Sequence, residues 1–289
     1  MRPLFEAYLA RQPRPLSAYA YAAQMLWQDH FQFSWVEVRH HFLLFAEYDG
    51  CIYMPLPPLG EPDPMLISAC FDWMDARNPH STISRIENVA ETDRAFYLSA
   101  GWEAVEKTPE YLYERAAQVS LRGNAYKTQR WACNAFKRRY TPHARPYISA
   151  DYPAAALLFK KWQEALRERH SKDPAALQML DDTAPVHHRA LERSIALTGW
   201  VVETPLGLAG YTLGCPLSSE MFCVILEVAD PTLSGAAAYL FRSFCESLSD
   251  YRWINAMDDS GLESLRRVKQ AAHPARLEPC YLIRHPRLA

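Results

Sequence analysis

The pattern of apolar and polar residues divides the first half of the chain into short strands and longer helices. Aromatic and β-branched residues dominate three early segments, and such composition favours strands. Asp49-Gly50 lies between the second and third segments, and this dipeptide is a strong signal for a two-residue hairpin turn. The prolines at 56–64 predict a loop. The three predicted strands are 33–38, 42–48 and 51–54.

The remainder of the first half is predicted to be mainly helical. Gly123 is expected to break the long segment 109–140 into two helices, because glycine interrupts a helical pattern. The prolines at 142 and 146 flank a short link, where we place a domain boundary between 1–144 and 145–289. The expected helices are 16–30, 65–78 and 109–140, with a strand at 83–89 and a weaker one at 98–107.

The second half follows an α/β order. Gly199 is expected to end the second of two helices, in the position that a helix terminus favours. Ser234 is predicted to cap a later helix, whose apolar residues recur every three or four positions from 237 to 248. Helices are therefore expected at 154–170, 184–198 and after 234, and strands at 200–203, 208–213, 221–228 and 253–255.

Composition changes this picture little. The chain of 289 residues has a formal net charge of −2 and is half apolar, so no global field indicates nucleic acid or membrane. Charge is uneven locally, because eight cations and only one carboxylate, Glu114, lie between 114 and 145. The seven cysteines occur singly, and neither a secretory signal nor an apolar run of membrane-spanning length is found. We expect a reduced, cytoplasmic protein.

The most informative stretch is 251–281. A short apolar strand leads into a polar turn with two adjacent carboxylates, Asp258 and Asp259. A helix follows, for which Ser260 and Glu263 fit a capping box and Leu262, Leu265 and Val268 form an apolar stripe. Arg266 and Lys269 are three residues apart and share a neighbouring face of that helix until Pro274 ends it. Carboxylates beside cations suit a charged substrate, while a well-capped, solvated surface helix explains the same residues.

This stretch resembles the C-terminal signature of the phosphatidylglycerol lysyltransferase C-terminal domain family, which reads approximately Ile-Asn-x-Glu-[Glu/Asp]-Asp-x-Gly-x-x-Gly-Leu-Arg-x-x-Lys, then His-Pro and Lys-Tyr. Ala256, Met257, Ser264 and Cys280 depart from it. The matching residues are Ile254, Asn255, Asp258, Asp259, Gly261, Leu265, Arg266, Lys269, His273, Pro274 and Tyr281.

A second motif of the family, Gly-x-x-Tyr-x-x-[Lys]-Arg-Asn-x-x-Asn-x-Phe, is similar to the basic segment. Gln129 and Trp131 replace the Lys and the first Asn. Packing alone also explains the pattern, if Tyr126, Trp131 and Phe136 anchor a basic amphipathic helix on the body of the protein. The functional interpretation is a cationic wall that meets phosphates, with a planar fork from Arg130 and a point charge from Lys127. The matching residues are Gly123, Tyr126, Arg130, Asn134 and Phe136.

A third, weaker match covers 210–214 and 224–230, where Val228 replaces a Lys of the family. It places Glu227 at a strand end beside the expected site, although a loop-facing carboxylate explains it too. The resemblance implies an α/β (α+β) fold of two tandem N-acetyltransferase-like (GNAT) domains, with mixed, mostly antiparallel sheets flanked by helices. It also implies an active site in the second half.

The cofactor prediction rests on what precedes the helix after Ser234. Acetyltransferases bind the coenzyme A pyrophosphate on a glycine-rich loop at a helix N-terminus. Here that loop keeps one glycine, Gly235, and Asp230 would repel a pyrophosphate. We therefore expect no coenzyme A, and the resemblance implies aminoacyl-tRNA as the donor. No metal site is expected either, because His187-His188 lacks ligand spacing.

The resulting hypothesis is transfer of an aminoacyl group from aminoacyl-tRNA to an amine or hydroxyl acceptor, which is a small molecule, a peptide or a lipid head group. Two alternatives remain open: an acyl-coenzyme A-dependent N-acyltransferase, and a non-catalytic binding module. The predicted catalytic residues are Asp258, Asp259, Arg266, Lys269 and Glu227. The predicted substrate-binding residues are Asn255, Arg130, Lys127, Tyr126, Asn134 and Tyr281, and Arg138 and Arg139 are predicted to contact tRNA.

Overall fold

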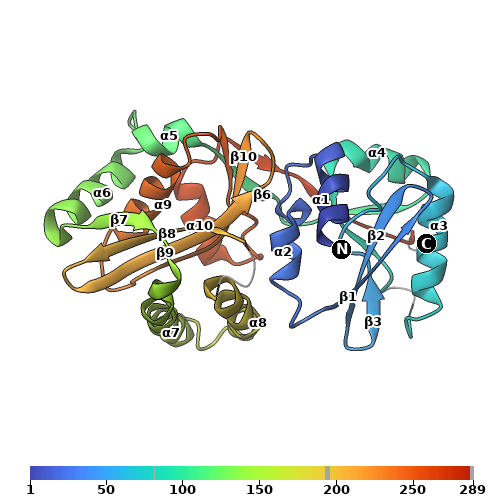
Figure 1. The fold of residues 1–289 in the computed structure, drawn as a ribbon, viewed down its shortest axis with the longest axis horizontal. Helices are drawn as coiled ribbons and strands as arrows, with labels where there is room; N and C mark the ends of the chain where they lie inside the picture. Colours follow the sequence, from blue (N-terminus) through green and yellow to red (C-terminus); the bar gives the residue numbers. More distant parts are fainter. Residues whose placement is uncertain (81–82, 193–195, 287–289) are drawn as a thin grey trace. The chain divides into compact units, whose positions relative to one another are not determined.

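The structure is a computed structural model that describes residues 1–80, 83–192 and 196–286 (Figure 1). It divides into two compact units, Met1–Glu110 with Leu277–Ala289, and Tyr111–Arg276. The sequence-based division at 144/145 differs from these units, because 111–144 contribute a strand and two helices to the second one. Among the described residues, no helix is both long and apolar enough to span a membrane.

Unit 1 contains two three-stranded sheets, ordered β1-β2-β3 and β4-β13-β5. The predicted hairpin is confirmed, and Asp49 and Gly50 both have the positive φ that its turn requires. Its elements are α1 (Arg2–Arg11), the 3-10 helix η1 (Ser17–Tyr19), α2 (Tyr21–Met25), β1 (Gln32–Val38), β2 (His41–Tyr48), β3 (Cys51–Tyr53), α3 (Pro64–Asp75), β4 (Ile86–Ala90), α4 (Glu91–Ser99), β5 (Glu103–Glu106) and β13 (Cys280–Arg284).

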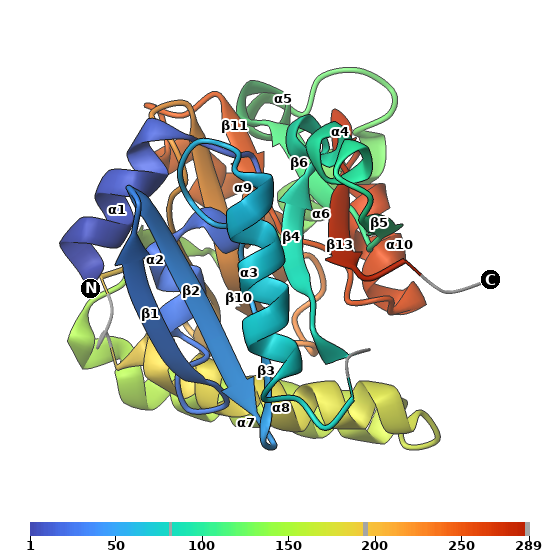
Figure 2. The same ribbon diagram turned by 90° about the vertical axis from the view of Figure 1, so that its right-hand side faces the viewer.

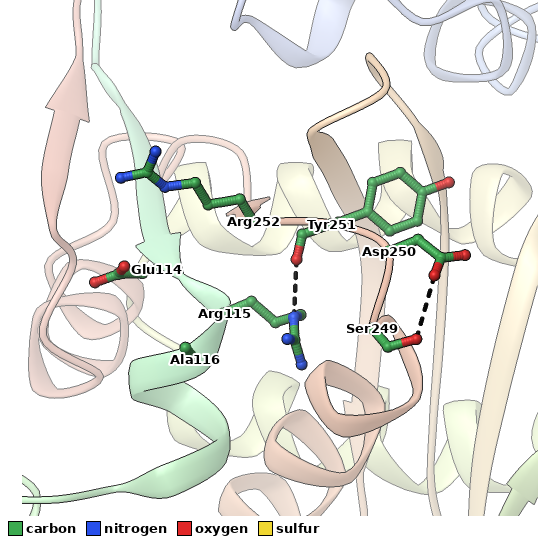
Figure 3. A pocket seen from close by; sticks show the side chains of 7 residues that line it. All are labelled: Glu114, Arg115, Ala116, Ser249, Asp250, Tyr251 and Arg252. Atoms are coloured by element: carbon green, nitrogen blue, oxygen red, sulfur yellow. Dashed lines mark hydrogen bonds between the residues drawn. The ribbon is translucent and has the colours of Figure 1, made fainter.

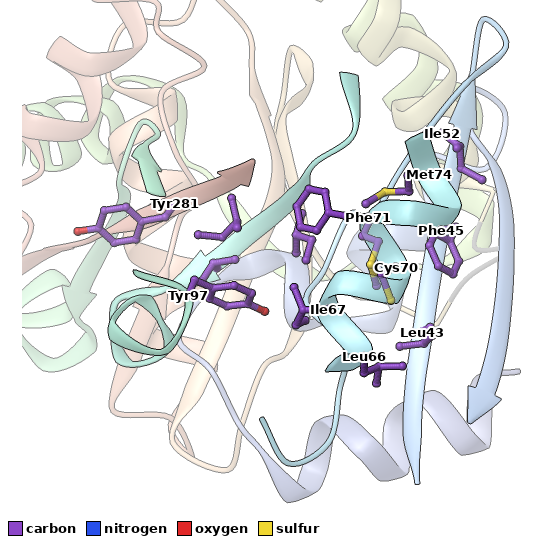
Figure 4. Close-up of a cluster of buried hydrophobic side chains, with 14 residues drawn as sticks. Leu43, Phe45, Ile52, Leu66, Ile67, Cys70, Phe71, Met74, Tyr97 and Tyr281 are labelled. Carbon is purple, nitrogen blue, oxygen red and sulfur yellow. The ribbon is translucent and has the colours of Figure 1, made fainter. Parts of the chain in front are cut away.

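Helix α3 organises the core of unit 1. The Asp63 carboxylate accepts hydrogen bonds from the amides of Met65 and Leu66, and Pro64 begins the helix, so that its start is well capped. In Figure 2 the helix lies beside β2 and β3. Its apolar face packs against both sheets in one buried cluster, whose labelled members in Figure 4 include Leu43, Phe45, Ile52, Leu66, Ile67, Phe71, Met74 and Tyr281.

Unit 2 is built on a seven-stranded sheet ordered β12-β6-β11-β10-β9-β8-β7. From β6 to β7 the neighbouring strands pair antiparallel, except for the parallel pair β10 and β11. Its elements are β6 (Glu110–Glu114), α5 (Arg115–Ser120), α6 (Lys127–Tyr140), β7 (His143–Pro146), the 3-10 helix η3 (Ser149–Asp151), α7 (Tyr152–Arg169), α8 (Pro174–Leu191), β8 (Thr198–Thr204), β9 (Gly207–Pro216), β10 (Met221–Ala229), α9 (Ala236–Ser247), β11 (Trp253–Asn255), α10 (Glu263–Ala271) and β12 (Arg276–Glu278).

Helices cover both faces of this sheet. Helices α7 and α8 lie together on one face, and α5, α6 and α9 lie on the other (Figure 1). The three-four apolar spacing predicted for α9 is confirmed by the burial of Leu240, Phe244 and Cys245 against the sheet. The α9 face is therefore the side on which the C-terminal motif and the basic segment meet.

Several predicted elements differ from the structure. The first part of the predicted helix 109–140 contains strand β6 (Glu110–Glu114), because Tyr111, Leu112 and Tyr113 are buried within the sheet of unit 2. The link predicted at 142–146 is strand β7, paired with β8. The predicted helix 16–30 is reduced to η1 and α2, where the amide and hydroxyl of Ser17 both donate to Glu110. Helices α1 and α4 were not predicted as such.

Helix ends also differ. Helix α8 begins earlier than predicted, with Asp173 as its cap, and ends at Leu191, whereas the predicted helix extended to 198; residues 193–195 of that prediction lie outside the described residues. Gly199 belongs to β8. Gly235, not Ser234, is the N-cap residue of α9. The capping box at Ser260 is wrong, since α10 begins at Glu263 after Leu262, with no side-chain cap among the described residues.

Gly235 is expected to be the most sensitive glycine of unit 2. Its φ is 89°, and a Cβ atom there would lie 2.6 Å from the carbonyl oxygen of Ala132 in α6. Gly235→Ala should lower the free energy of unfolding by about 1–3 kcal/mol, because the added Cβ would clash with α6 and the residue would have to keep a positive φ. Gly123→Ala is the matched control, with the same φ of 89° and open space around it. Equal losses for the two variants in urea unfolding would contradict this prediction.

Candidate functional site

The candidate site lies where strand β10 continues beyond the end of its parallel neighbour β11. Their pairing ends at Cys223 with Asn255, after which β10 continues to Ala229. The chain leaves β11 and forms a loop, residues 256–262, that leads into α10. This divergence leaves the end of β10 next to the loop and α10 on the α9 face of the sheet.

Asn255 fixes the beginning of the loop. Its side chain is fully buried, and its Oδ1 accepts a hydrogen bond of 2.6 Å from the amide of Met257. Met257 has a φ of 60°, which is unusual for a non-glycine residue. The backbone of Tyr111 in β6 also bonds to Ala256 and Met257, at 3.0 Å each. Asn255 therefore shapes the loop from within.

Asp259 is the buried carboxylate of the pair, with 1% of its surface exposed. Its Oδ2 accepts hydrogen bonds from the Tyr111 hydroxyl at 2.6 Å and from Arg266 Nε at 3.0 Å. Its Oδ1 accepts from the amide of Gly261 at 3.0 Å. Burial alone would raise the pKa of Asp259, but these hydrogen bonds together hold that pKa below its usual value. It stays ionised and ties α10 to β6.

Asp258 has a different environment. It is partly exposed, and its Oδ1 accepts a hydrogen bond of 2.8 Å from the amide of Ser260, which has a φ of 51°. The two adjacent aspartates thus differ in environment. The carboxylate of Asp259 accepts three hydrogen bonds from the protein, whereas the carboxylate of Asp258 is partly exposed to solvent.

Lys269 reaches back from α10 to the loop. Its ammonium donates to the carbonyls of Ala256 and Met257, the latter at 3.3 Å, and lies 5.6 Å from the centroid of the Tyr111 ring. The hydroxyl of Tyr113 donates to the carbonyl of Lys269 at 2.8 Å. The lysine and the two tyrosines of β6 thus form one cluster with Asp259 and Arg266.

Glu227 on β10 faces the same cluster. Its Oε2 is buried and accepts no hydrogen bond within the described part of the chain. Burial raises the pKa of Glu227 to about 8, and the nearby charge of Lys269 only partly offsets this effect. Its charge in turn contributes to the raised pKa values of Tyr113 and Cys245. Near neutral pH, Glu227 is therefore a carboxyl group that can hold or release a proton.

The basic segment joins the site through its loop. The Arg130 guanidinium donates to the carbonyls of Leu121 and Gly123, so that it closes the loop before α6. Gln129 donates to the carbonyl of Ala271, and the Tyr126 ring lies 5.1 Å from that of His273. The start of α6 is thereby attached to the end of α10.

Other residues of the segment point elsewhere. Lys127, Asn134, Arg138 and Arg139 are exposed on α6. The expectation that Trp131 packs on the body is wrong, since 65% of its surface is exposed. The predicted apolar stripe of α10 is also incomplete, because none of its residues is buried and Val268 is exposed.

Tyr281 lies on β13 and belongs to unit 1. Its hydroxyl donates to Glu91, which raises its pKa, and the Arg94 guanidinium lies 4.8 Å from its ring centroid. The structure describes its surroundings only within unit 1.

A surface pocket of about 300 Å³ is found in unit 2, and it contains none of the predicted site residues (Figure 3). Arg115 lies inside it and donates to the carbonyl of Tyr251 at 2.8 Å. The pocket is lined by Glu114, Arg115, Ala116, Ser249, Asp250, Tyr251 and Arg252.

Neither a cluster of metal-ligating side chains nor a disulfide occurs among the described residues. No group of three or more His, Cys, Asp or Glu side chains in that part of the chain could hold a metal ion. All seven cysteines are described, and none of them forms a disulfide. The buried Cys245 has a raised pKa, because burial disfavours its thiolate.

Solved structures share this fold. A conserved protein of unknown function from Bacteroides thetaiotaomicron superposes with a TM-score of 0.86 at 18% identity, over 98% of this chain and 95% of that one. L-PGS from Bacillus licheniformis gives 0.66 at 14% identity, over 100% and 93%. A tandem GNAT protein from the clavulanic acid biosynthesis pathway gives 0.53 at 10% identity, over 99% and 95%. The predicted fold is confirmed: this is a tandem GNAT-like α/β protein with mostly antiparallel sheets.

The family follows from the sequence match. The profile described as phosphatidylglycerol lysyltransferase, C-terminal, matches residues 10–284. The chain belongs to the phosphatidylglycerol lysyltransferase C-terminal domain family, as its motifs predicted. None of the curated proteins matches it in a sequence search.

Proposed function

We propose that this chain transfers an aminoacyl group from aminoacyl-tRNA to an amine or hydroxyl acceptor. Family membership supports the class of reaction. The observation that carries the proposal is Glu227, a half-buried residue whose Oε2 is buried without a hydrogen-bond partner in the described residues and whose pKa is raised to about 8 by burial. A general base works best when its pKa lies near the operating pH.

In the proposed reaction, the acceptor nitrogen or oxygen attacks the carbonyl carbon of the aminoacyl ester. A new amide or ester bond forms, and the bond to the terminal ribose oxygen of the tRNA breaks. Glu227 takes the proton of the acceptor, and that proton then passes to the departing ribose oxygen, so that charge and protons balance.

The neighbouring charges have distinct roles in this proposal. Asp258, with its exposed carboxylate, binds the α-ammonium of the aminoacyl group. Asp259 holds Arg266 and the loop in place, and the partly exposed Arg266 meets the developing oxyanion or a phosphate. Lys269 positions the loop carbonyls and sets the electrostatic environment of Glu227. Arg130 shapes the loop before α6, through which the segment approaches the tRNA.

The structure weighs against acyl-coenzyme A as the donor. Phosphate binding at the start of α9 would need open backbone at Gly235, but a Cβ atom there would already meet Ala132 of α6 at 2.6 Å. Asp230 lies in the same turn, where its carboxylate accepts a hydrogen bond from the amide of Thr232 and pairs with Lys161 at 2.7 Å, so that this cation is engaged by a carboxylate and not by a phosphate. The residues present do not fit a pyrophosphate.

The test is single-turnover transfer with a mixture of charged tRNAs. Each tRNA carries a radiolabelled amino acid, and the acceptors are small amines, peptides and phosphatidylglycerol vesicles. We expect acceptor-dependent loss of label from one class of tRNA. A parallel thermal-shift assay compares coenzyme A with a non-hydrolysable aminoacyl-adenosine, and only the latter should stabilise the chain. Strong stabilisation by coenzyme A would refute the proposal, and silence from both ligands with no transfer would indicate a binding module.

A further inference from the structure

One face of helix α6 is polar, cationic and exposed, and it carries one large aromatic ring. Lys127, Trp131, Asn134 and Arg138 recur at a spacing of four, three and four residues, which places them in one line along the helix. All four are exposed. We call these four residues the α6 stripe.

The opposite face of α6 is fully occupied. Phe136 is buried, and its ring lies 5.3 Å from that of Tyr239 in α9. Cys133 is buried on the same side, and Ala132 lies against Gly235. Packing therefore explains one side of the helix and leaves the α6 stripe unexplained.

The composition of the stripe indicates a ligand. The 14 residues of α6 include five cations and no carboxylate. Cations in the last turn of a helix suit its dipole, but this does not account for Lys127 in the first turn or for Trp131 between them. Trp131 is 65% exposed and therefore lacks the burial that normally stabilises an indole ring. Cations that flank an exposed aromatic ring are the combination that binds single-stranded nucleic acid.

We propose that the α6 stripe binds the single-stranded acceptor end of tRNA. Trp131 stacks on an unpaired base, and Lys127 and Arg138 contact phosphates on either side, about 16 Å apart along the helix axis. Asn134 lies in the same line and donates to a base edge or a phosphate. This inference rests on the proposed function, which supplies the tRNA.

A membrane surface is the competing ligand, and the structure favours RNA. A helix that lies in a membrane interface buries its apolar face among the acyl chains. The apolar face of α6 is already packed on α9, so that Trp131 is the only large apolar side chain of the helix left for lipid. One ring in a polar line suits base stacking better than insertion.

The experiment measures binding of uncharged RNA to the full chain by fluorescence anisotropy. The probes are an acceptor-stem minihelix with a single-stranded 3′ tail and the same minihelix without the tail. Trp131→Ala should weaken binding of the tailed RNA about five- to 100-fold, which is the range for loss of one stacked base. Trp131→Tyr should keep most of the affinity, and the tailless RNA should respond to neither variant.

Charge variants provide a second readout. Lys127→Ala and Arg138→Ala should each reduce the slope of log K against log salt by about 0.7, because each cation releases counterions from a single strand. Leu157→Ala and Lys160→Ala, on the exposed side of α7, are the matched apolar and cationic controls and should change neither affinity nor slope.

The outcomes separate this inference from the proposed function. Unchanged affinity of Trp131→Ala for the tailed RNA, or no RNA binding by the wild type, would overturn the α6 stripe. The inference would also be overturned if binding to phosphatidylglycerol vesicles depended on Trp131 and RNA binding did not. Transfer that persists in Trp131→Ala would leave the transferase intact while the stripe fails. RNA binding that depends on the α6 stripe, with no transfer to any acceptor, would support the stripe and contradict the proposed transferase function.

Discussion

Glu227→Gln is expected to lose most transfer activity and yet to be more stable than the wild type at pH 8. The side chain keeps its size but can no longer accept a proton. If Glu227 is the general base, the rate should fall about 10²- to 10⁴-fold, the usual contribution of such a group. In the wild type, kcat/KM should rise as pH approaches the pKa of about 8, and this limb should disappear in the variant.

The stability effect follows from proton linkage. The native state keeps the proton of Glu227 up to pH 8, whereas an unfolded glutamate releases it near pH 4.3. Between these values the native state binds more protons, so that raising the pH destabilises the wild type. The variant does not undergo this loss, so that relative to the wild type it should be more stable by up to about 5 kcal/mol at pH 8, at about 1.4 kcal/mol for each pH unit between the two values, with little difference at pH 4.

Urea unfolding at both pH values, together with a pH–rate profile, measures these effects. Glu220→Gln is the matched control, because Glu220 is exposed immediately before β10. It should change neither quantity. A Glu227→Gln variant that is destabilised at pH 8 and keeps its full rate would show that this carboxylate is structural.

Asp259→Ala is expected to cause the largest loss of stability in the C-terminal motif. The substitution removes the acceptor of three hydrogen bonds and leaves the hydroxyl of the buried Tyr111 without its partner. The free energy of unfolding should fall by about 3 kcal/mol, the upper end for hydrogen bonds to a charged group. Asp258→Ala, one residue earlier and partly exposed, should cost about 0.5 kcal/mol or less.

The difference between these two variants should depend on pH. Because the pKa of Asp259 is lowered in the native state, its contribution is present above the unfolded value near 3.9 and is lost as pH falls through the lower native value. Wild type and Asp259→Ala should therefore converge below about pH 4. Equal destabilisation by the two alanine variants at neutral pH would refute the assigned roles.

Local signals predicted the fold where they agreed with tertiary packing. The hairpin at Asp49-Gly50 was predictable, since only a few dipeptides adopt both positive φ values. Strand β6 was missed because its flanking sequence is helical and its strand partners, β11 and β12, lie far away in the sequence; Tyr113, for example, pairs with Ile254 of β11. No local pattern encodes such a partner.

The candidate site was predictable in identity but not in role. The family motifs identified Asp259, Arg266 and Lys269, but the sequence could not tell that the carboxylate of Asp259 is fully hydrogen-bonded within the protein while Asp258 is partly exposed. Burial decides that difference, and burial depends on Tyr111 from a distant strand. Glu227 was placed at a strand end by its motif, and only the surrounding apolar residues reveal its raised pKa.

The central strand of one sheet in unit 1 has a consequence for biosynthesis. Strand β13 lies between β4 and β5, and its Tyr281 and Ile283 complete the core around α3. The ribosome must therefore synthesise the chain as far as Arg284 before that core can form. All residues of Tyr111–Arg276 have been translated by then. Unit 2 can thus mature first, and the N-terminal portion waits as a nascent intermediate with exposed apolar surface, the kind of species that chaperones bind.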